Sequence, residues 1–344
     1  MKVVQVVKRF GLCGGMEEYA YRLANELCIL GVKVKVVCEE KLKNPKESNI
    51  ETFELGKSLK KPRWLSHLIF AKKVRSWVIK NADKNTIVHS HERIDCHHVT
   101  TIHSTLYNFP PKRKFPSFRN YCNEYIEHRE LNCASVQKIV PVSGLITNQI
   151  SEKYTKTRHK LVSPIPPGVS PLNTKKKEFD PEVPVIGFMG KEWKRKGLPK
   201  VIEIWRELRK EIPLARLCLA GFSTNEPIGI LEDELKFVDL LGYVKRKEDF
   251  YEKIDLLLHP ANKEAYGMVI AEASNMKIPV LCSDHCGAAY HNLRSVHSTN
   301  LKKTNTHWAI QALEITNESH INNPASKPYS WKENAQNYLD LYNS

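Results

Sequence analysis

Residues 3–37 read VVQVVKRFGLCGGMEEYAYRLANELCILGVKVKVV, and this stretch decides the fold. The apolar run Val3–Val7 is typical of a buried parallel strand. A glycine-containing loop follows, apolar residues then recur at helical spacing from about Met16 to Leu30, and a second apolar run covers Val32–Val37. Gly31 is placed to end the helix. This order of strand, glycine loop, helix and strand is a βαβ unit, which indicates an α/β protein.

The same order starts again in the second half of the chain. Residues 184–190 favour a strand, a basic loop follows, residues 198–211 favour a helix, and residues 215–220 favour the next strand. Further strands are predicted at Ile87–His91, Val99–His103, Lys138–Val142, Leu235–Leu241, Leu256–His259 and Ile278–Cys282, and further helices at Phe118–Cys133 and from about Gly267.

A proline-rich and lysine-rich stretch between residues 164 and 184 predicts the boundary between two domains. We therefore expect two Rossmann-like βαβ domains, residues 1–172 and 173–327, that face each other across a cleft. Ligands of such sheets bind at the carboxyl ends of the strands, where loops meet the first turns of helices.

The 344 residues include 53 lysines and arginines and 38 aspartates and glutamates, so the net charge is +15. Residues 1–170 carry +14 of this excess. Such a field concentrates anionic partners on one half of the molecule: nucleic acid, an anionic membrane or a phosphorylated substrate. A solvated lysine-rich surface is the alternative interpretation.

The chain has no run of 18 apolar residues, so no membrane-spanning helix is expected. The N-terminus is typical of a first strand and not of a secretory signal. The nine cysteines form no CxxC pair, which is consistent with free thiols in a reducing compartment.

Two glutamates flank the start of a predicted helix in residues 259–273, HPANKEAYGMVIAEA. Glu264 precedes the helix and can accept hydrogen bonds from hydroxyl groups. Glu272 lies a little over two turns further on, where it can bind a ribose diol. The N–H groups of Tyr266, Gly267 and Met268 can bind phosphate. The alternative is a helix with a solvated glutamate on its outer face.

Three further segments offer groups that could contact a phosphate or face the cleft. In residues 190–197, GKEWKRKG, Lys191 and Lys196 are placed to neutralise a diphosphate, unless this is only a basic surface loop. Gly14 and Gly15 allow close approach of the backbone to a phosphate, although they form neither GxGxxG nor a P-loop. His103 ends a predicted strand and points toward the cleft, unless it is a structural histidine.

These segments resemble the retaining glycosyltransferases of family 4, which share the two-domain GT-B fold. Glu264 and Glu272 match the E-x7-E motif of the family, and Lys191 and Lys196 match its G-R/K-x4-K-G motif, with lysine at 191 where arginine is usual. The remaining matches are Gly14-Gly15, His103, Pro166–Val169, Leu241–Val244 and Ser330-Trp331. The resemblance implies that Tyr243 and Val244 contact the base of the nucleotide. It also implies that Ser330-Trp331 starts a last helix, within residues 328–344, that crosses back to the first domain. A closer resemblance is to lipopolysaccharide-core glucosyltransferases.

The resemblance implies transfer of a hexose from a nucleotide diphosphate sugar, such as a UDP-sugar, with retention of the anomeric configuration. The implied acceptor is a membrane-associated glycolipid in the assembly of lipopolysaccharide or another surface glycan. Glu264, His103, Lys191 and Lys196 are the implied catalytic residues, and no protein nucleophile is assigned. We expect a cytoplasmic enzyme on the inner face of the cytoplasmic membrane, because Lys112, Arg113, Lys114 and Arg119 alternate with aromatic residues. A sugar-nucleotide epimerase and a nucleic-acid binding protein are the alternatives.

No metal or other cofactor is expected, since the chain contains no DxD motif and the two lysines can neutralise the diphosphate. The competing hypothesis is a zinc site, for which the sequence offers His89, His91, His97, His98 and His103. No cysteine or acidic residue stands at a convincing partner spacing.

Overall fold

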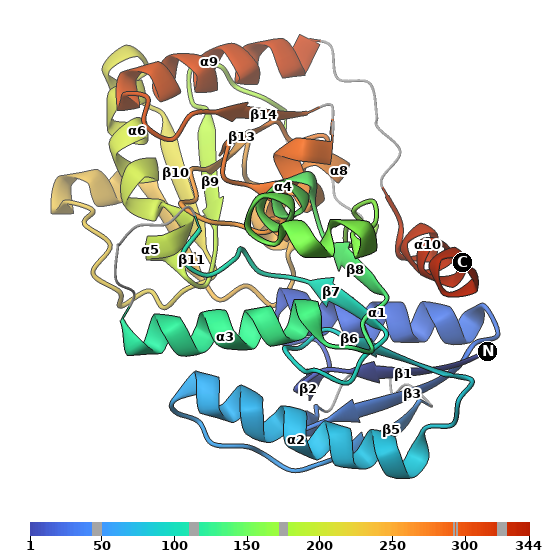
Figure 1. Ribbon diagram of the computed structural model, residues 1–344. Coiled ribbons are helices and arrows are strands. Elements are labelled where there is room, and N and C mark those ends of the chain that lie inside the picture. The colour runs from blue at the N-terminus through green and yellow to red at the C-terminus, as the bar shows by residue number, and fades with distance from the viewer. Residues whose placement is uncertain (43–49, 110–116, 172–177, 292, 294, 322–328) are drawn as a thin grey trace. The chain divides into compact units, whose positions relative to one another are not determined.

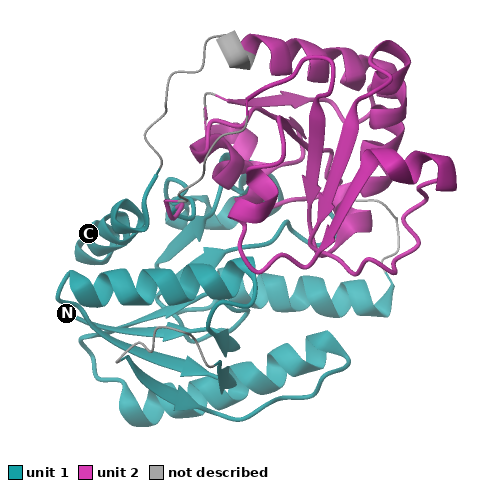
Figure 2. Ribbon diagram, turned by 180° about the vertical axis from the view of Figure 1, so that it is seen from behind, with its two compact units in different colours: residues 1–168, 329–344 teal, residues 169–328 magenta. Residues whose placement is uncertain are grey.

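The computed structural model describes residues 1–42, 50–109, 117–171, 178–291, 293, 295–321 and 329–344 (Figure 1). It divides into two compact units, residues 1–168 with 329–344 (unit 1) and residues 169–328 (unit 2) (Figure 2). The domain boundaries expected at 172/173 and 327/328 fall on residues outside the described ranges, and so do Lys112, Arg113 and Lys114.

Unit 1 is built on a parallel six-stranded sheet with the order β5-β3-β1-β6-β7-β8. Its strands are β1 (Lys2–Val6), β3 (Lys33–Cys38), β5 (Glu51–Glu54), β6 (Thr86–Ser90), β7 (Val99–Ile102) and β8 (Lys138–Pro141). A short parallel pair, β2 (Arg9–Phe10) and β4 (Glu40–Lys41), extends beyond this sheet. Strand order reverses beside β1, which lies between β3 and β6, as in a doubly wound sheet.

The helices of unit 1 are α1 (Gly15–Ile29), α2 (Arg63–Asn81), α3 (Phe118–Asn132), α4 (Gly144–Lys153), the 3-10 helix η1 (Thr155–Lys160) and α10 (Trp331–Asn343). The predicted first helix is confirmed, and its face Tyr19, Leu23 and Leu27 is buried. Gly31 follows this helix with φ +83°, a conformation that favours glycine.

The last helix, α10, packs on α1 within unit 1. Ser330 and Glu333 form a capping box at its start, which satisfies N–H groups that the first turn leaves unpaired. A Cβ on Gly168 would lie 2.4 Å from the backbone nitrogen of Trp331, so this close approach requires glycine. Asn334 adds hydrogen bonds from Nδ2 to Tyr19 Oη (2.9 Å) and Pro166 O (2.7 Å).

Unit 2 repeats the architecture with the strand order β11-β10-β9-β12-β13-β14, again parallel. Its strands are β9 (Val185–Met189), β10 (Arg216–Ala220), β11 (Val238–Gly242), β12 (Leu256–His259), β13 (Val280–Ser283) and β14 (Val296–Thr299). Its helices are α5 (Trp193–Lys196), α6 (Leu198–Glu211), η2 (Glu232–Phe237), α7 (Glu248–Tyr251), α8 (Met268–Asn275), η3 (Gly287–His291) and α9 (Asn305–Ile321). The prediction of two Rossmann-like units is confirmed.

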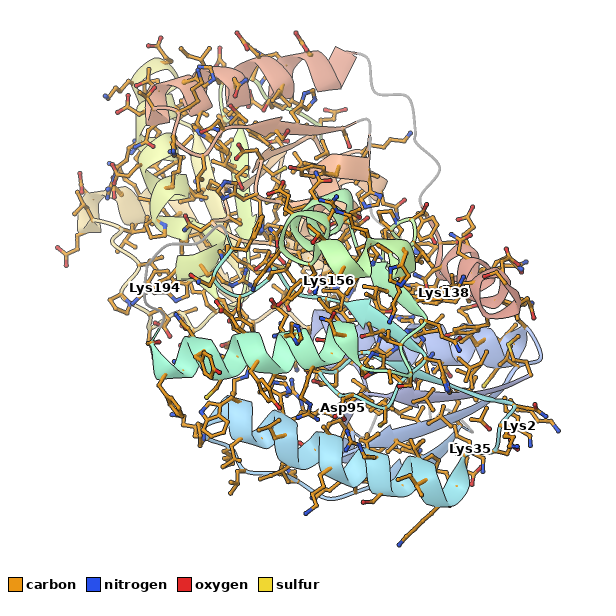
Figure 3. All side chains as sticks on the ribbon, in the orientation of Figure 1. Lys2, Lys35, Asp95, Lys138, Lys156 and Lys194 are labelled. Atoms are coloured by element: carbon orange, nitrogen blue, oxygen red, sulfur yellow. The ribbon has the colours of Figure 1, made fainter. Side chains whose placement is uncertain are left out.

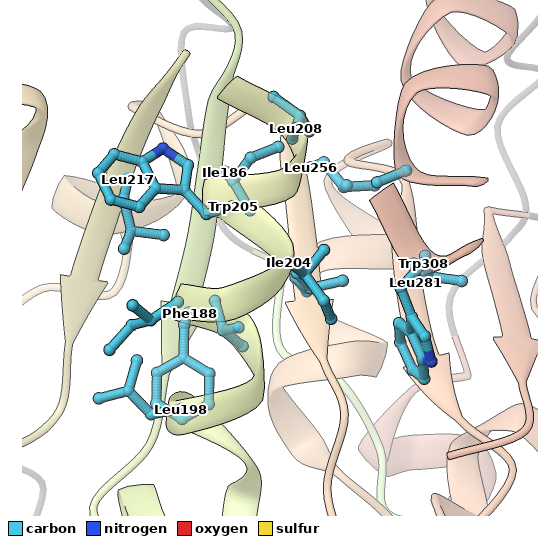
Figure 4. Packing of buried hydrophobic residues seen from close by; sticks show 14 of the residues in the cluster. Ile186, Phe188, Leu198, Ile204, Trp205, Leu208, Leu217, Leu256, Leu281 and Trp308 are labelled. Carbon is cyan, nitrogen blue, oxygen red and sulfur yellow. The ribbon is translucent and has the colours of Figure 1, made fainter. Parts of the chain in front are cut away.

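The main core of unit 2 lies between the sheet and helices α6 and α9 (Figure 4). Trp205 of α6 and Trp308 of α9 are fully buried, and Trp205 Nε1 donates to Ala215 O at 3.0 Å. Burial of each large apolar side chain contributes about 1.5–3 kcal/mol. This packing holds the carboxyl ends of β9 and β12, from which the loops of the candidate site leave.

The prediction of a strand over Leu235–Leu241 is wrong in its first part. Residues 232–237 form the 3-10 helix η2, and the strand begins only at Val238. Glu234 fixes this turn, because its carboxylate accepts from the N–H of Leu231 at 2.8 Å and from Arg206 Nε at 2.7 Å. An ion pair from a distant helix therefore overrides the local strand pattern.

Candidate active site

The basic loop after β9 is folded back on itself so that Lys196 faces the interior of unit 2. The side chain of Lys196 crosses Gly190, where an added Cβ would lie 2.5 Å from Lys196 Cδ. Gly197, with φ +91°, then starts α6, and a Cβ there would lie 2.2 Å from Pro260 O. Lys191 remains exposed at the start of the loop. Glycines on both sides of Lys196 thus allow this loop to press against the loop that follows β12.

Glu264 lies in the loop after β12, and its backbone is held by the segment after β13. Its N–H donates to His285 O at 3.1 Å, and its carbonyl accepts from Gly287 N at 3.0 Å. The carboxylate has Lys196 Nζ at 3.4 Å and Arg195 Nη1 at 3.5 Å, with the side chain 15% exposed. The sequence predicted Glu264 and Lys196 separately, and the structure brings them together.

Arg195 is a site residue that sequence reasoning missed. Besides Glu264, its guanidinium hydrogen-bonds Lys263 O and Glu192, with Nε 2.8 Å from Glu192 Oε2. It therefore ties the basic loop to the Glu264 loop. Its position next to Lys196 was the only sequence signal that could have identified it.

Burial would by itself raise the pKa of Glu264, but nearby His259, Lys196 and Arg195 outweigh it and lower that pKa to about 2. The carboxylate is therefore ionised at any physiological pH and acts as an acceptor of hydrogen bonds. His259, a second residue that the sequence analysis did not select, is fully buried with Nε2 3.8 Å from Glu264. Burial lowers the pKa of His259, and the Glu264 carboxylate beside it acts in the opposite direction.

The helix α8 starts four residues beyond Glu264, with Gly267 as its N-cap. Gly267 has φ +102°, and a Cβ there would lie 2.8 Å from Ile270 Cδ1. Tyr266 and Gly267 are buried and Met268 is half-buried, with Tyr266 O accepting from Ala288 N at 2.8 Å. The first N–H groups of a helix have no partner within the helix, so this end can receive an anion.

Glu272 is buried on α8, and both of its carboxylate oxygens already have partners. Tyr251 Oη donates to Oε2 at 2.8 Å, and Lys247 pairs with Oε1. These two residues belong to the segment that follows β11, where Tyr243 is 65% exposed and Val244 half-buried. Glu272 thus holds the segment after β11, which contains Tyr243 and Val244, the two residues that the resemblance implies contact the nucleotide base.

Gly14 and Gly15 lie in unit 1, between β2 and the body of α1. Gly14 is extended, and a Cβ there would lie 2.4 Å from Glu17 Oε2, whereas Gly15 has open space around it. Arg9 Nε donates to Glu17 Oε1 at 3.1 Å. A paired carboxylate in the first turn of α1 was not foreseen from the glycines.

His103 directly follows β7 in unit 1, and its Nε2 lies 2.9 Å from His91 Nδ1. The Tyr19 ring meets the His103 ring edge-on with 4.8 Å between centroids. Burial lowers the pKa of His103 to about 3, so the ring is neutral.

Two of the five histidines proposed as zinc ligands, His89 and His98, form hydrogen bonds with groups outside that set. His89 bonds Thr101 Oγ1 (2.8 Å) and Tyr342 Oη (2.6 Å), and His98 Nδ1 accepts from Val88 N at 3.0 Å. In the described part of the chain, no group of three or more histidine, cysteine, aspartate or glutamate side chains is arranged to hold a metal ion.

The surface formed by α2 and α3 combines exposed aromatic residues with cations. Phe118, Tyr121 and Tyr125 are 73%, 62% and 53% exposed and follow one another at i, i+3 and i+7 along α3. Arg119 of the same helix has no carboxylate partner among the described residues. Trp64 of α2 stands edge-on to Phe118 at 6.0 Å between ring centroids.

Other cations of unit 1 are neutralised locally. Lys35 pairs with Glu51 at 3.1 Å, and Lys2, labelled with it in Figure 3, pairs with Asp83. Asp95, also labelled there, accepts from Arg129 Nε of α3 at 3.0 Å and pairs with Arg75 of α2. Asp95 thereby ties the two helices together. Of the described residues, none lies in a helix that is long and apolar enough to cross a membrane.

Two family models match successive parts of the chain and together cover residues 13–337. "Glycosyltransferase Family 4" matches residues 13–171, and "Glycosyl transferases group 1" matches residues 170–337. Lipopolysaccharide glucosyltransferase WaaG of Escherichia coli strain K12 is 23% identical over 206 residues, which are 55% of this chain and 54% of WaaG. This alignment spans about half the length of the relative.

Solved structures show the same fold over almost the whole chain. The crystal structure of WaaG, a glycosyltransferase involved in lipopolysaccharide biosynthesis, has a TM-score of 0.77 at 16% identity and covers 98% of this chain and 95% of its own. Anabaena HepE, solved in complex with UDP and glucose, has a TM-score of 0.65 at 14% identity and covers 100% of both chains.

Proposed function

The chain belongs to the two-domain glycosyltransferases of the GT-B fold, and from this premise we propose that it moves a hexose, with retention, from a UDP-sugar to a membrane-associated glycolipid. The observation that carries the proposal is the cluster at Glu264, where one ionised carboxylate lies within 3.5 Å of Lys196 and Arg195, four residues before the start of α8. Such a cluster offers an acceptor for sugar hydroxyls next to fixed positive charge for a diphosphate.

The donor diphosphate is assigned to Lys191, Lys196 and the first N–H groups of α8. Transfer of the hexose leaves negative charge on the diphosphate, and preorganised cations and helix dipoles stabilise that charge as it develops. Glu264 holds hydroxyls of the transferred sugar. A uridine donor is proposed by analogy with HepE, which has the same fold and was solved in complex with UDP and glucose.

Glu272 is assigned to the ribose hydroxyls. A carboxylate has about four acceptor positions, and Tyr251 and Lys247 use only part of them. Gly14, Gly15 and His103 are assigned to the diphosphate and the sugar on the resemblance to family 4 alone.

The proposed reaction needs neither a protein nucleophile nor a metal ion. Attack of the acceptor hydroxyl from the face of the leaving group retains the configuration, and the leaving phosphate oxygen takes the hydroxyl proton. Lys191, Lys196 and Arg195 supply charge that a divalent ion would otherwise supply.

The surface of α2 and α3 is the proposed contact with an anionic membrane at the inner face of the cytoplasmic membrane. Exposed rings at helical spacing favour the interface between headgroups and acyl chains, and the net charge of +14 on residues 1–170 adds attraction to anionic lipids. The acceptor would then be a glycolipid of lipopolysaccharide or another surface glycan. The similarity to WaaG supports this choice of acceptor.

The test is release of nucleoside diphosphate by the purified protein from a panel of UDP-, GDP- and ADP-sugars with membrane lipid extract, in the presence of EDTA. Glu264→Ala should abolish the release, and Glu226→Ala, at an exposed position of the same unit, should not. Product formation with inverted configuration, or a requirement for divalent ions, would contradict the proposal. Consumption of a UDP-sugar without release of UDP would favour an epimerase, and retention of oligonucleotides at moderate salt would favour a nucleic-acid binding protein.

A further inference from the structure

His91 and His103, which follow β6 and β7, are joined by a hydrogen bond, and their surroundings differ in a way that determines which ring nitrogens carry the protons. His91 is 3% exposed, and its backbone N–H is fixed to Val6 O at 2.9 Å. Its Nδ1 lies 2.9 Å from His103 Nε2, so one of these two nitrogens donates and the other accepts.

The other nitrogen of the His91 ring identifies the donor. His91 Nε2 is buried and has no hydrogen-bond partner among the described residues. If His103 donated, the proton of neutral His91 would lie on Nε2 and leave a buried N–H unpaired, which costs more than a buried lone pair. His91 therefore carries its proton on Nδ1 and donates it to His103 Nε2.

This direction fixes the tautomer of His103 as well. Its Nε2 lone pair is occupied by His91, and burial lowers the pKa of both rings, so the single proton of neutral His103 lies on Nδ1. No described residue forms a hydrogen bond with His103 Nδ1. The ring thus keeps one N–H donor for a ligand and has no free lone pair with which to act as a base.

Neighbouring rings hold the pair in this arrangement. The His89 ring lies 4.5 Å from that of His91, and both nitrogens of His89 are already bonded to Thr101 and Tyr342, so His89 cannot supply a partner for His91 Nε2. Tyr19 of α1 packs against both His91 (5.8 Å) and His103 (4.8 Å).

We propose that His91 is a positioning residue, whose Nδ1–H fixes His103 as the Nδ1–H tautomer and so makes His103 a hydrogen-bond donor to a hydroxyl of the donor sugar. The ligand in this statement rests on the proposed function, whereas the tautomer does not. His91 acts through His103 and touches no substrate itself.

The test combines ring-nitrogen NMR of the ¹⁵N-histidine-labelled full chain with kinetics of two variants. His91→Asn keeps an amide nitrogen where Nδ1 lies, and His91→Phe keeps a ring of similar size without the donor. His159→Phe, at an exposed histidine of the same unit, is the control, and thermal unfolding verifies that each variant folds. We expect the Nδ1–H tautomer at His103 in the wild type and in His91→Asn, and its loss in His91→Phe.

The kinetic expectation is a loss of kcat/KM of roughly ten- to a hundredfold in His91→Phe, with His91→Asn within about threefold of wild type. A proton on Nε2 of His103 in the wild type, or equal loss in both variants, would overturn the inference. If the wild type consumes no donor at all, the proposed function fails, and the NMR result still decides the tautomer.

Discussion

Replacing Glu264 by glutamine removes one negative charge from a cluster that contains Lys196 and Arg195 while keeping the size of the side chain. The pKa of Glu264 lies at about 2 rather than 4.5, a difference of about 2.5 units. At about 1.36 kcal/mol per unit, ionisation of this carboxylate stabilises the folded chain by about 3 kcal/mol at neutral pH. We expect Glu264→Gln to lower the free energy of unfolding by roughly that amount.

The sign of the pH dependence follows from the lowered pKa. The contribution is fully present above the pKa of the unfolded chain and is lost as the pH falls from about 4.5 toward 2. Urea unfolding of both proteins between pH 7 and pH 3 measures this, and the difference in stability should be constant down to about pH 5 and shrink below it.

The same substitution should also lower activity, because a charged acceptor of a sugar hydroxyl contributes about 1.5–3 kcal/mol per hydrogen bond. With two hydroxyls held, kcat/KM for nucleoside diphosphate release should drop by about two orders of magnitude or more at pH 7. The control is Glu226→Gln. A Glu264→Gln protein with unchanged stability and kcat/KM within about threefold of wild type would refute the electrostatic account of this cluster.

Three further substitutions test the neighbouring features. Gly197→Ala should lower the free energy of unfolding, measured in urea, by about 3 kcal/mol or more, because φ is +91° and a Cβ would lie 2.2 Å from a carbonyl oxygen. The control is Gly229→Ala, which has φ +83° and open space around the added Cβ and should lower the free energy of unfolding by only about 1–2 kcal/mol. Lys196→Gln should lower kcat about ten- to a hundredfold with a smaller change in donor KM, as measured by initial rates, because its charge acts on the leaving diphosphate. Replacing Tyr121 and Tyr125 together by serine should weaken binding to vesicles of anionic lipid in sedimentation assays and leave the melting temperature unchanged, since both rings are exposed; unchanged binding would remove α3 from the proposed membrane contact.

The sequence predicted the strands and helices that carry the site because their signals are local. Apolar runs at Val3–Val7 and Leu256–His259 and the helical spacing of Tyr19, Leu23 and Leu27 need no distant residue to be read, and the structure confirms them. The prediction of a strand starting at Leu235 was wrong because a distant residue determines the structure there. Arg206 of α6 bonds Glu234 and holds it in a turn.

Only some of the residues of the candidate site could be predicted from the sequence. Glu264 and Lys196 could be selected because a carboxylate before a helix and a lysine before a glycine are local patterns. Arg195 and His259 could not be selected in this way. Arg195 reaches Glu264 only after β9 and β12 become neighbours in the sheet, and the fold of the loop after β12 brings His259 and Glu264 within 3.8 Å of each other.

By itself, then, the sequence determined two βαβ units, the excess of positive charge in residues 1–170 and the residue types of the candidate site. Tertiary structure alone decided which cations share the Glu264 carboxylate, which partners already hold Glu272 and which nitrogen of His103 carries the proton. The reason is physical: spacing along a chain sets the face on which a side chain lies, whereas pKa, tautomer and ion pairing depend on burial and on groups that only folding brings within about 4 Å.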